Sequence, residues 1–362
     1  MEFELTESQR GLFDRFARWA RERMTAPDRD GGGSPRLRWE STCAADVAGL
    51  AEVTDLVLAM QALGYAGADV PTVLALSCHL FGGVLPLSRW GTAEQQADCL
   101  PRLASGEWYA ARVLPGNMEA EITGGGFRLT GATGIASAGL RPDLALVCAP
   151  VSGVPAPSCR AFLVPLADTS GILWERSRGS TLGCADTLRL DQVMVPDDRV
   201  LGVCVDGDAL LADLLPREQL VLQATRLGLL QKLLETALGA ARKYTRRLKL
   251  KGVPPHRYQM LGHKLADFRL RFDAAELMVR RAAWQMDRHG AAVADIALAG
   301  LAIDSGLMPS AFEVVRLQRD YGFDEDQAWS EWLADAVEYG RYLCNPAQMR
   351  AAVSDALRAG VA

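Results

Sequence analysis

One carboxylate lies inside a strongly apolar stretch of this sequence. Glu218 occurs in Leu215–Leu234, LPREQLVLQATRLGLLQKLL, where leucines recur at the spacing of one helical face. Pro216 suits the first turn of a helix, because its missing N–H would have no intrahelical partner there. A glutamate in this position has two interpretations. It is either a helix-start anchor favoured by the helix dipole, or a base that removes a weakly acidic proton in an apolar pocket.

The other residue types that commonly do chemistry form no recognisable constellation. The chain has eight cysteines and four histidines. No C-x-x-C pair occurs and the histidines show no ligand spacing, so we predict no metal site. Cysteines spread singly along a chain are typical of reduced, mostly buried thiols in a cytoplasmic protein.

Length and charge exclude several classes of protein. A chain of 362 residues is too long for one hydrophobic core, so two or three packed units are expected. The net charge of −5 gives no general attraction to nucleic acid or to an anionic membrane. No apolar run reaches the roughly 18–20 residues that would span a bilayer. The N-terminus is charged at once and has no signal-peptide core.

The hydrophobic period divides the chain into three parts. Residues 1–110 have helical periodicity, residues 111–206 alternate like the strands of a small antiparallel domain, and residues 207–362 are helical again. We therefore predict an α+β protein with an N-terminal helical domain, a middle β-domain and a C-terminal four-helix bundle.

Several elements can be placed more closely. Thr6 with Gln9 predicts a capping box for the first helix, and the GGGF string at 124–127 predicts a hairpin turn. Helices are expected at 54–66, 71–87 and 91–103, the last ended by Pro101, and then at 208–250, 258–289, 291–320 and 325–359.

Five strings, in the same order, resemble the acyl-CoA dehydrogenase superfamily. One is GTAEQQADCLPRLASGEW, which is similar to the family's "G-t-x-E-Q-x-x-x-x-L-P-x-L-x-x-G" string. The resemblance covers nearly the whole chain and implies the family's fold, with the same three parts as above. The five strings lie at 3–14, 91–108, 129–147, 181–202 and 258–268.

The resemblance also implies a reaction. In this family a glutamate removes the α-proton of an acyl thioester while a hydride goes to a flavin. Most members carry the glutamate in a C-terminal "I-Y-E-G-T" string, where this chain has Cys344. One branch carries it in an "E-R-L-V-L-A" string, which Glu218–Gln223 resembles. The resemblance therefore implies Glu218 as the base, and a second acid near the same pocket could come from any of five residues, Asp335, Glu338, Tyr339, Tyr342 and Cys344.

Four residues keep polar groups at positions that the resemblance assigns to the flavin. Ser137 has a hydroxyl where the family's threonine faces the ring. Arg246 and Arg247 lie close to the position of an arginine that reaches the flavin pyrophosphate, and Gln259 lies in the string at 258–268.

Other flavin and substrate positions depart from the family pattern. Val113 replaces the hydroxyl residue of the "T/S-E-P" string, and Ile135 replaces an aromatic residue. Arg319 and Asp320 replace two glycines that let backbone approach a phosphate closely. We therefore predict an eroded flavin site. The sequence assigns no cofactor, and FAD is kept as the alternative.

Three hypotheses for function follow. In the first, the enzyme has lost flavin and uses Glu218 for acid–base chemistry on a thioester of coenzyme A or a carrier protein. In the second, the chain is a divergent FAD-dependent acyl-CoA or acyl-carrier-protein dehydrogenase. In the third, it is a catalytically silent subunit that pairs with an active paralogue.

The setting and the partners are inferred from the resemblance and from residue usage. Usage rich in alanine, arginine and glycine suggests a bacterium in which divergent members serve specialised-metabolite biosynthesis. The family resemblance implies a homodimer or homotetramer, or a hetero-oligomer with a paralogue.

Overall fold

The protein was studied as a computed structural model, which describes residues 5–23, 50, 52–68, 70–113, 116–136, 140–154, 159–167, 169–176, 185–203, 205–252, 259–290, 292–321, 337 and 345–360. The chain forms two compact units. The helical unit comprises Met1–Thr25, Ala51–Val70 and Gln219–Ala362, and the sheet unit comprises Ala26–Leu50 and Pro71–Glu218. The segment 1–110 therefore contributes helices to both units.

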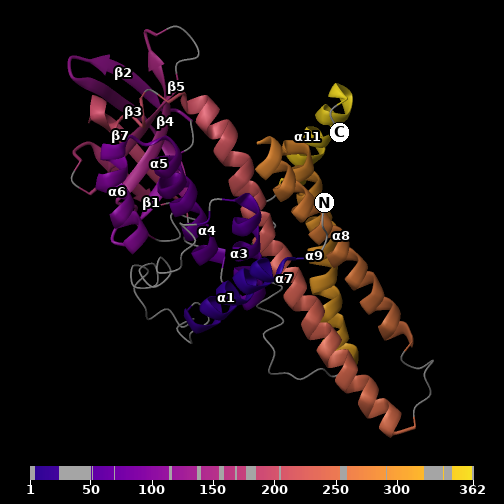
Figure 1. The fold of residues 1–362 in the computed structure, drawn as a ribbon. Helices are drawn as coiled ribbons and strands as arrows, with labels where there is room; N and C mark the ends of the chain where they lie inside the picture. Colours follow the sequence, from indigo (N-terminus) through magenta and orange to yellow (C-terminus); the bar gives the residue numbers. More distant parts are fainter. Residues whose placement is uncertain are drawn as a thin grey trace. The chain divides into compact units, whose positions relative to one another are not determined.

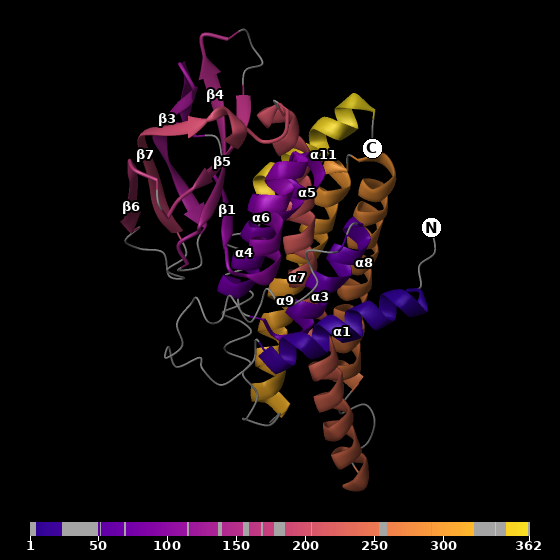
Figure 2. The same cartoon turned by 60° about the vertical axis from the view of Figure 1, so that its left-hand side comes forward.

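The sheet unit is built on a seven-stranded curled sheet (Figure 1, Figure 2). Its order is β1-β4-β2-β3-β7-β6, and β5 also pairs with β4. The predicted hairpin at Gly124 and Gly125 is confirmed and joins β2 to β3. Four of the strand pairings are antiparallel, as predicted, but β1 and β2 both pair with β4 in parallel, which the prediction did not include. The strands are β1 Ala110–Val113, β2 Glu119–Thr123, β3 Gly126–Ala136, β4 Leu144–Ser152, β5 Cys159–Pro165, β6 Ile172–Arg176 and β7 Ala185–Pro196.

The two faces of β1 have different surroundings. Ala111 and Val113 belong to the hydrophobic core of the sheet, together with Val147 and Phe162. Side chains alternate along a strand, so Arg112 projects from the opposite face. This alternation places one charged side chain on the face that the helices of the same unit cover.

Three consecutive helical segments cover that face. They replace the single helix predicted at 71–87 and are α4 Val70–His79, the π-helical turn η3 Leu80–Val84, and α5 Leu85–Trp90. A Cβ added at Gly82 would lie 2.4 Å from the carbonyl carbon of Ala111, and one at Gly83 would lie 2.4 Å from the Ala110 Cβ. Glycine is required at both positions because η3 approaches the β1 backbone more closely than a side chain allows.

Helix α6, Ala93–Ser105, is fixed by a glutamine at its N-terminus. Thr92 and Gln95 form a capping box, and the Gln95 amide also donates to the carbonyls of Asp198 and Val200 at 2.8 and 2.7 Å. The Gln95 Oε1 accepts from the N–H of Gly202 at 3.0 Å. One buried side chain therefore closes the helix and holds the segment after β7, which includes the 3₁₀ turn η4 Asp197–Arg199.

The end of α6 differs from the prediction. Pro101 does not end the helix, which continues to Ser105 and stops at the left-handed Gly106. Proline removes the hydrogen bond to the carbonyl four residues earlier, which here belongs to Ala97. Both Pro101 and Ala97 are exposed, so we infer that water can satisfy that carbonyl.

The helical unit contains long helices close to the predicted ones. The first helix has the predicted Thr6–Gln9 capping box. Helix α7 begins at Gly207, so Pro216 lies inside it rather than in its first turn. Of the segment predicted at 325–359, the described part forms α11. The helices are α1 Glu7–Arg23, α3 Val53–Ala66, α7 Gly207–Leu250, whose residues from Gln219 belong to this unit, α8 Gln259–His289, α9 Val293–Tyr321 and α11 Pro346–Ala359.

Two glycines let α3 and α7 cross in close contact. A Cβ at Gly64 would lie 1.9 Å from the backbone oxygen of Thr225, and one at Gly228 would lie 1.9 Å from the backbone oxygen of Gln61. Each contact sets the backbone of one helix directly against the other. The packing of this pair therefore depends on the absence of side chains at the crossing.

Two helical segments are long and apolar enough to cross a membrane, Thr72–Trp90 and Val293–Leu317. The expectation that no segment reaches this length is therefore wrong by length and composition. Within the protein, 72% of the first and 44% of the second are buried. Core helices commonly show the same apolar length, so these two segments are weak support for a membrane span.

We predict that Gly228→Ala lowers the free energy of unfolding by about 2–3 kcal/mol, because the new methyl group overlaps the Gln61 carbonyl. The matched control is Gly239→Ala in the same helix, where nothing lies within 4 Å. There the change should raise stability by about 0.5–1 kcal/mol, since alanine favours a helix over glycine. Urea unfolding of both variants measures the difference, and equal effects would contradict a tight crossing.

Candidate functional site

Glu218 lies well inside α7. The helix begins at Gly207, so about three turns precede the glutamate. The interpretation of Glu218 as a first-turn anchor is therefore wrong, because the dipole effect is confined to the first turn. A carboxylate in a helix interior needs partners from the surrounding structure, and the structure supplies two.

Arg112 and Ser77 hold the Glu218 carboxylate. The Arg112 Nη2 forms an ion pair with Oε2 of Glu218. The Ser77 Oγ donates to Oε1 at 3.2 Å. Only 9% of the Arg112 side chain and 12% of the Glu218 side chain are exposed. These three residues come from α4, β1 and α7 and all belong to the sheet unit.

The guanidinium of Arg112 has donors that its ion pair does not use. Its Nε and Nη1 are buried and have no hydrogen-bond partner among the described residues. A buried donor left without an acceptor costs about 1–3 kcal/mol. The arrangement is therefore a paired carboxylate beside a cation that can still donate.

Cys148 lies in the electrostatic field of this pair. Burial raises the pKa of its thiol to about 12, although the positive charge of Arg112 acts in the opposite direction. The thiol is therefore neutral at physiological pH and is a poor nucleophile. Cys148 is therefore no alternative to Glu218 as a base.

His79 connects three elements near the site. Its Nδ1 accepts from the N–H of Ala110 at 3.2 Å, so the proton resides on Nε2, which donates to the Leu103 carbonyl at 3.2 Å. Burial lowers the pKa of His79 to about 3. The imidazole is neutral, and it links the end of α4 to α6 and to the start of β1, the strand that carries Arg112.

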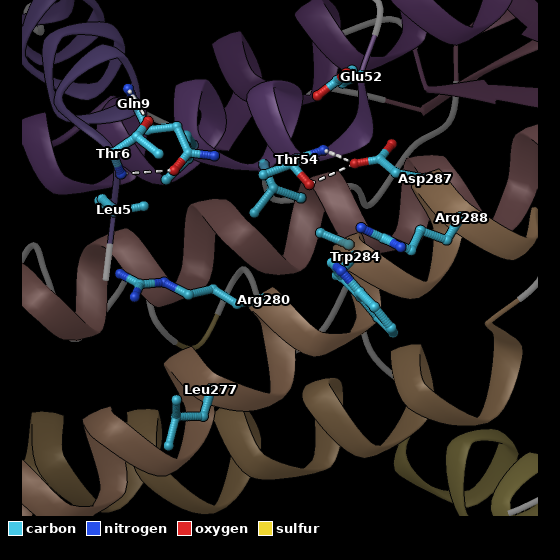
Figure 3. A pocket seen from close by; sticks show the side chains of 13 residues that line it. Leu5, Thr6, Gln9, Glu52, Thr54, Leu277, Arg280, Trp284, Asp287 and Arg288 are labelled. Carbon is cyan, nitrogen blue, oxygen red and sulfur yellow. Dashed lines mark hydrogen bonds between the residues drawn. The ribbon is translucent and has the colours of Figure 1, made fainter. Parts of the chain in front are cut away.

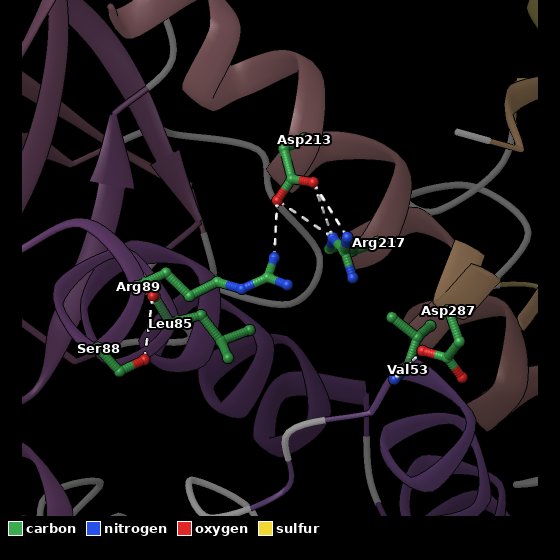
Figure 4. Close-up of polar contacts among 7 residues, drawn as sticks. All are labelled: Val53, Leu85, Ser88, Arg89, Asp213, Arg217 and Asp287. Carbon is green, nitrogen blue, oxygen red and sulfur yellow. Dashed lines mark hydrogen bonds and ion pairs between the residues drawn. The ribbon is translucent and has the colours of Figure 1, made fainter. Parts of the chain in front are cut away.

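Asp213 stabilises the part of α7 that precedes Glu218. Its carboxylate accepts from Arg217, one turn further along the helix, and from Arg89 of α5 at 3.0 Å (Figure 4). Arg217 is only 8% exposed. This network ties α7 to α5 within the sheet unit and holds the turn that carries Glu218.

The remaining predicted site residues lie elsewhere or cannot be placed. Ser137 and Cys344 fall outside the described residues. Arg246 and Arg247 lie exposed near the end of α7, and Gln259 is exposed as the first residue of α8. These three belong to the helical unit, whereas Glu218 is the last residue of the sheet unit.

Two of the flavin positions can be tested within the sheet unit. Val113 is 0% and Ile135 is 1% exposed, and both are members of the sheet core. Apolar side chains packed in that core offer no polar contact to a flavin ring. These two side chains therefore supply no polar contact to a flavin, whereas the exposed cations Arg246 and Arg247 would suit a phosphate.

The helical unit has a separate pocket of about 720 Å³ (Figure 3). It is lined by parts of α1, α3 and α8, including Arg280, Trp284 and Asp287. Asp287 accepts from the N–H groups of Val53 and Thr54 at 2.8 and 3.0 Å, which caps the start of α3. Asp287 therefore has a structural task, and none of the predicted site residues lines this pocket.

Metal ligands are likewise absent from the described part of the chain, which contains no group of three or more His, Cys, Asp or Glu side chains able to hold an ion. Sequence reasoning found Glu218 but missed Ser77 and Arg112. Arg112 carried a signal, since it is the only charge in the apolar run Tyr109–Val113. A lone charge in a buried strand implies a buried counter-charge.

Domain models of one family match most of the sequence. "Acyl-CoA dehydrogenase, N-terminal domain" matches residues 6–107, and "Acyl-CoA dehydrogenase, C-terminal domain" matches residues 209–339. The second match begins just after the start of α7 and includes Glu218.

Curated relatives and solved structures agree with these matches. An L-prolyl-[peptidyl-carrier protein] dehydrogenase of Pseudomonas fluorescens is 28% identical over 303 residues, 77% of this chain and 76% of the relative. A protein of the same name from a Serratia species is 26% identical, over 75% of this chain and 73% of the relative. A solved structure described as PigA with FAD and proline superposes with a TM-score of 0.82 at 22% identity, over 100% of both chains. This last likeness shows the fold alone.

We predict that His79 makes the protein sensitive to mild acid. With a pKa of about 3 in the folded chain and an ordinary value of 6.5, the unfolded chain binds an extra proton between these pH values. The free energy of unfolding should therefore fall as the pH decreases through this window, by about 1.4 kcal/mol per unit below pH 6.

Urea unfolding between pH 4.5 and 7.5 measures this slope. His79→Gln should be less stable than the wild type at pH 7.5 but should show a shallower slope, because it removes the titrating group. His263→Gln, at an exposed position in α8, is the control and should keep the wild-type slope. Parallel slopes for His79→Gln and the wild type would argue against a buried neutral imidazole.

Proposed function

Because the chain belongs to the acyl-CoA dehydrogenase superfamily and has its fold, we propose that it acts at the α-carbon of an acyl thioester, with Glu218 as the base. The thioester is carried on coenzyme A or on a carrier protein. The proton transfer itself requires no flavin, so the chain can catalyse exchange or isomerisation at that carbon without a redox step.

The buried Glu218 carboxylate is the observation that supports this proposal. A thioester carbonyl acidifies the neighbouring C–H, and a carboxylate shielded from water can accept that proton. The proton passes to a Glu218 oxygen, and the electron pair of the C–H bond becomes the double bond of an enolate. Ser77 and Arg112 fix the direction in which the carboxylate points.

A flavin would add hydride acceptance to this chemistry when it is bound. On the resemblance, Arg246, Arg247 and Gln259 would be its contacts in the helical unit, with Ser137 facing the ring. Val113 and Ile135 lie in the sheet core and do not fit a ring contact. For this reason the proposal includes no step through flavin and treats the flavin site as eroded.

FAD-dependent dehydrogenation is the second candidate, and a specific observation favours it. Both relatives named above are L-prolyl-[peptidyl-carrier protein] dehydrogenases and align with three quarters of this chain or more. By extension, the substrate here would be an aminoacyl or acyl group on a carrier protein, in a bacterial specialised-metabolite pathway. A cytoplasmic homo-oligomer is part of the same proposal.

One experiment separates these functions. The purified protein is examined for flavin absorbance at about 450 nm and for flavin released on denaturation. It is then incubated in D₂O with a prolyl-loaded carrier protein and with butyryl-CoA, and the products are analysed by mass spectrometry. Deuterium at the α-carbon reports proton transfer, and loss of two hydrogens reports dehydrogenation.

We expect a colourless protein that exchanges the α-hydrogen of one of these probes. Glu218→Gln should slow exchange by about 10²–10⁴-fold, because it removes the base. Glu235→Gln is a matched control in α7, since Glu235 bonds Tyr65 and Gln231 and lies outside the site. A yellow protein that removes two hydrogens would replace the proposal with the second candidate. If neither exchange nor oxidation is observed, both candidates are overturned and the silent subunit is the function that remains.

A further inference from the structure

Arg112 has more donors than its known partner uses. One nitrogen, Nη2, is paired with Glu218, while Nε and Nη1 are buried without an acceptor among the described residues. More than nine tenths of the side chain is buried. Buried donors in folded proteins nearly always have acceptors, so an unmatched pair beside a carboxylate needs an explanation.

A role as counter-ion does not account for these donors. Neutralising Glu218 requires only a point charge, which a lysine would provide with a compact ammonium. Arginine instead presents five N–H groups in a rigid planar fork. An oxygen that accepts from Nη1 would therefore lie next to the Glu218 carboxylate, which occupies the adjacent nitrogen.

We propose that the free guanidinium donors of Arg112 bind the carbonyl oxygen of the thioester and stabilise the enolate that forms when Glu218 removes the α-proton. This inference rests on the function proposed above. It assigns to Arg112 direct contact with the reacting atoms, and thus a catalytic role. The two side chains are not completely enclosed, since 9% of Arg112 and 12% of Glu218 remain exposed.

The charges balance throughout this step. Before the reaction, the cation of Arg112 is compensated by the carboxylate of Glu218. When the carboxylate accepts the proton it becomes neutral, and the negative charge appears on the enolate oxygen. The C–H electron pair forms the new carbon–carbon double bond, and the carbonyl π pair moves to the oxygen. Arg112 therefore faces one negative charge before and after the transfer, which avoids a buried unpaired ion.

Arg112→Lys tests the proposal because it keeps a cation for Glu218 but removes the fork. The α-deuterium exchange in D₂O, measured with prolyl-loaded carrier protein and butyryl-CoA, should lose about 10²–10³ in kcat with KM little changed, as for loss of an oxyanion donor. Urea unfolding should show that Arg112→Lys changes the free energy of unfolding far less than it changes kcat, because lysine still neutralises Glu218. The control Arg128→Lys, at an exposed position paired with Glu121, should exchange at the wild-type rate.

A second measurement separates enolate binding from the base. Acetoacetyl-CoA and an acetoacetyl-loaded carrier protein form enolates that absorb in the ultraviolet, and their bound fraction can be titrated without turnover. The wild type should lower the pKa of the bound probe, and Arg112→Lys should lower it less. Glu218→Gln should lower the pKa of the bound probe more than the wild type does, because no carboxylate then competes with the enolate for the guanidinium.

The outcomes distinguish the two proposals. If Arg112 only positions Glu218, both variants weaken enolate binding alike, and that result overturns the inference. Wild-type exchange in Arg112→Lys overturns it as well. If the wild type ionises the probe but exchanges no α-hydrogen, Glu218 is not the base, while the assignment of Arg112 stands. If Arg112→Lys fails to fold, the titration of Glu218→Gln still distinguishes the two roles of Arg112. A lower pKa of the bound probe supports enolate binding, and weaker enolate binding contradicts it.

Discussion

A charge removed from water requires a counter-charge, and in the sheet unit this constraint joins Arg112 to Glu218. Arg112 is the only charged residue of β1, so it has no substitute partner in its own strand. Removing one member of a buried pair typically costs about 3–5 kcal/mol, because the other charge remains without compensation. Strand β1 and helix α7 therefore have to meet at one relative position, and Ser77 of α4 completes the contact.

Other polar groups of the unit fix the elements that bring this pair together. His79 uses both ring nitrogens on backbone groups, which fixes β1 against α4 and α6. Gly82 allows η3 to lie directly against β1. Asp213 links α7 to α5 through Arg89 and also pairs with Arg217 within α7. The apolar core of the sheet supplies most of the stability, while these few polar contacts select which strand position faces which helix turn.

Local signals in the sequence predicted much of this architecture. The capping box of α1, the glycine hairpin and the helical periods of α3, α8 and α9 depend on residues close together in the chain, and all were placed within a few residues. Pro216 was assigned to the first turn of a helix although it lies inside α7, because proline has the same sequence signature in both places. The parallel pairing of β1 with β4 could not be predicted, since it joins segments about thirty residues apart with no local mark. For the same reason the pairing of Arg112 with Glu218 could not be predicted, although Arg112 stands out as a lone charge in an apolar run.

The position of Gln95 has a consequence for related sequences. Capping boxes accept either glutamate or glutamine at this place, since both offer an oxygen to the helix N-terminus. Here the amide nitrogen also donates to two carbonyls, which a carboxylate would repel. The choice of glutamine rather than glutamate at this position is therefore linked to the packing of the segment after β7 against α6. A relative with glutamate at this position would have to route that segment differently, or hold it with other donors.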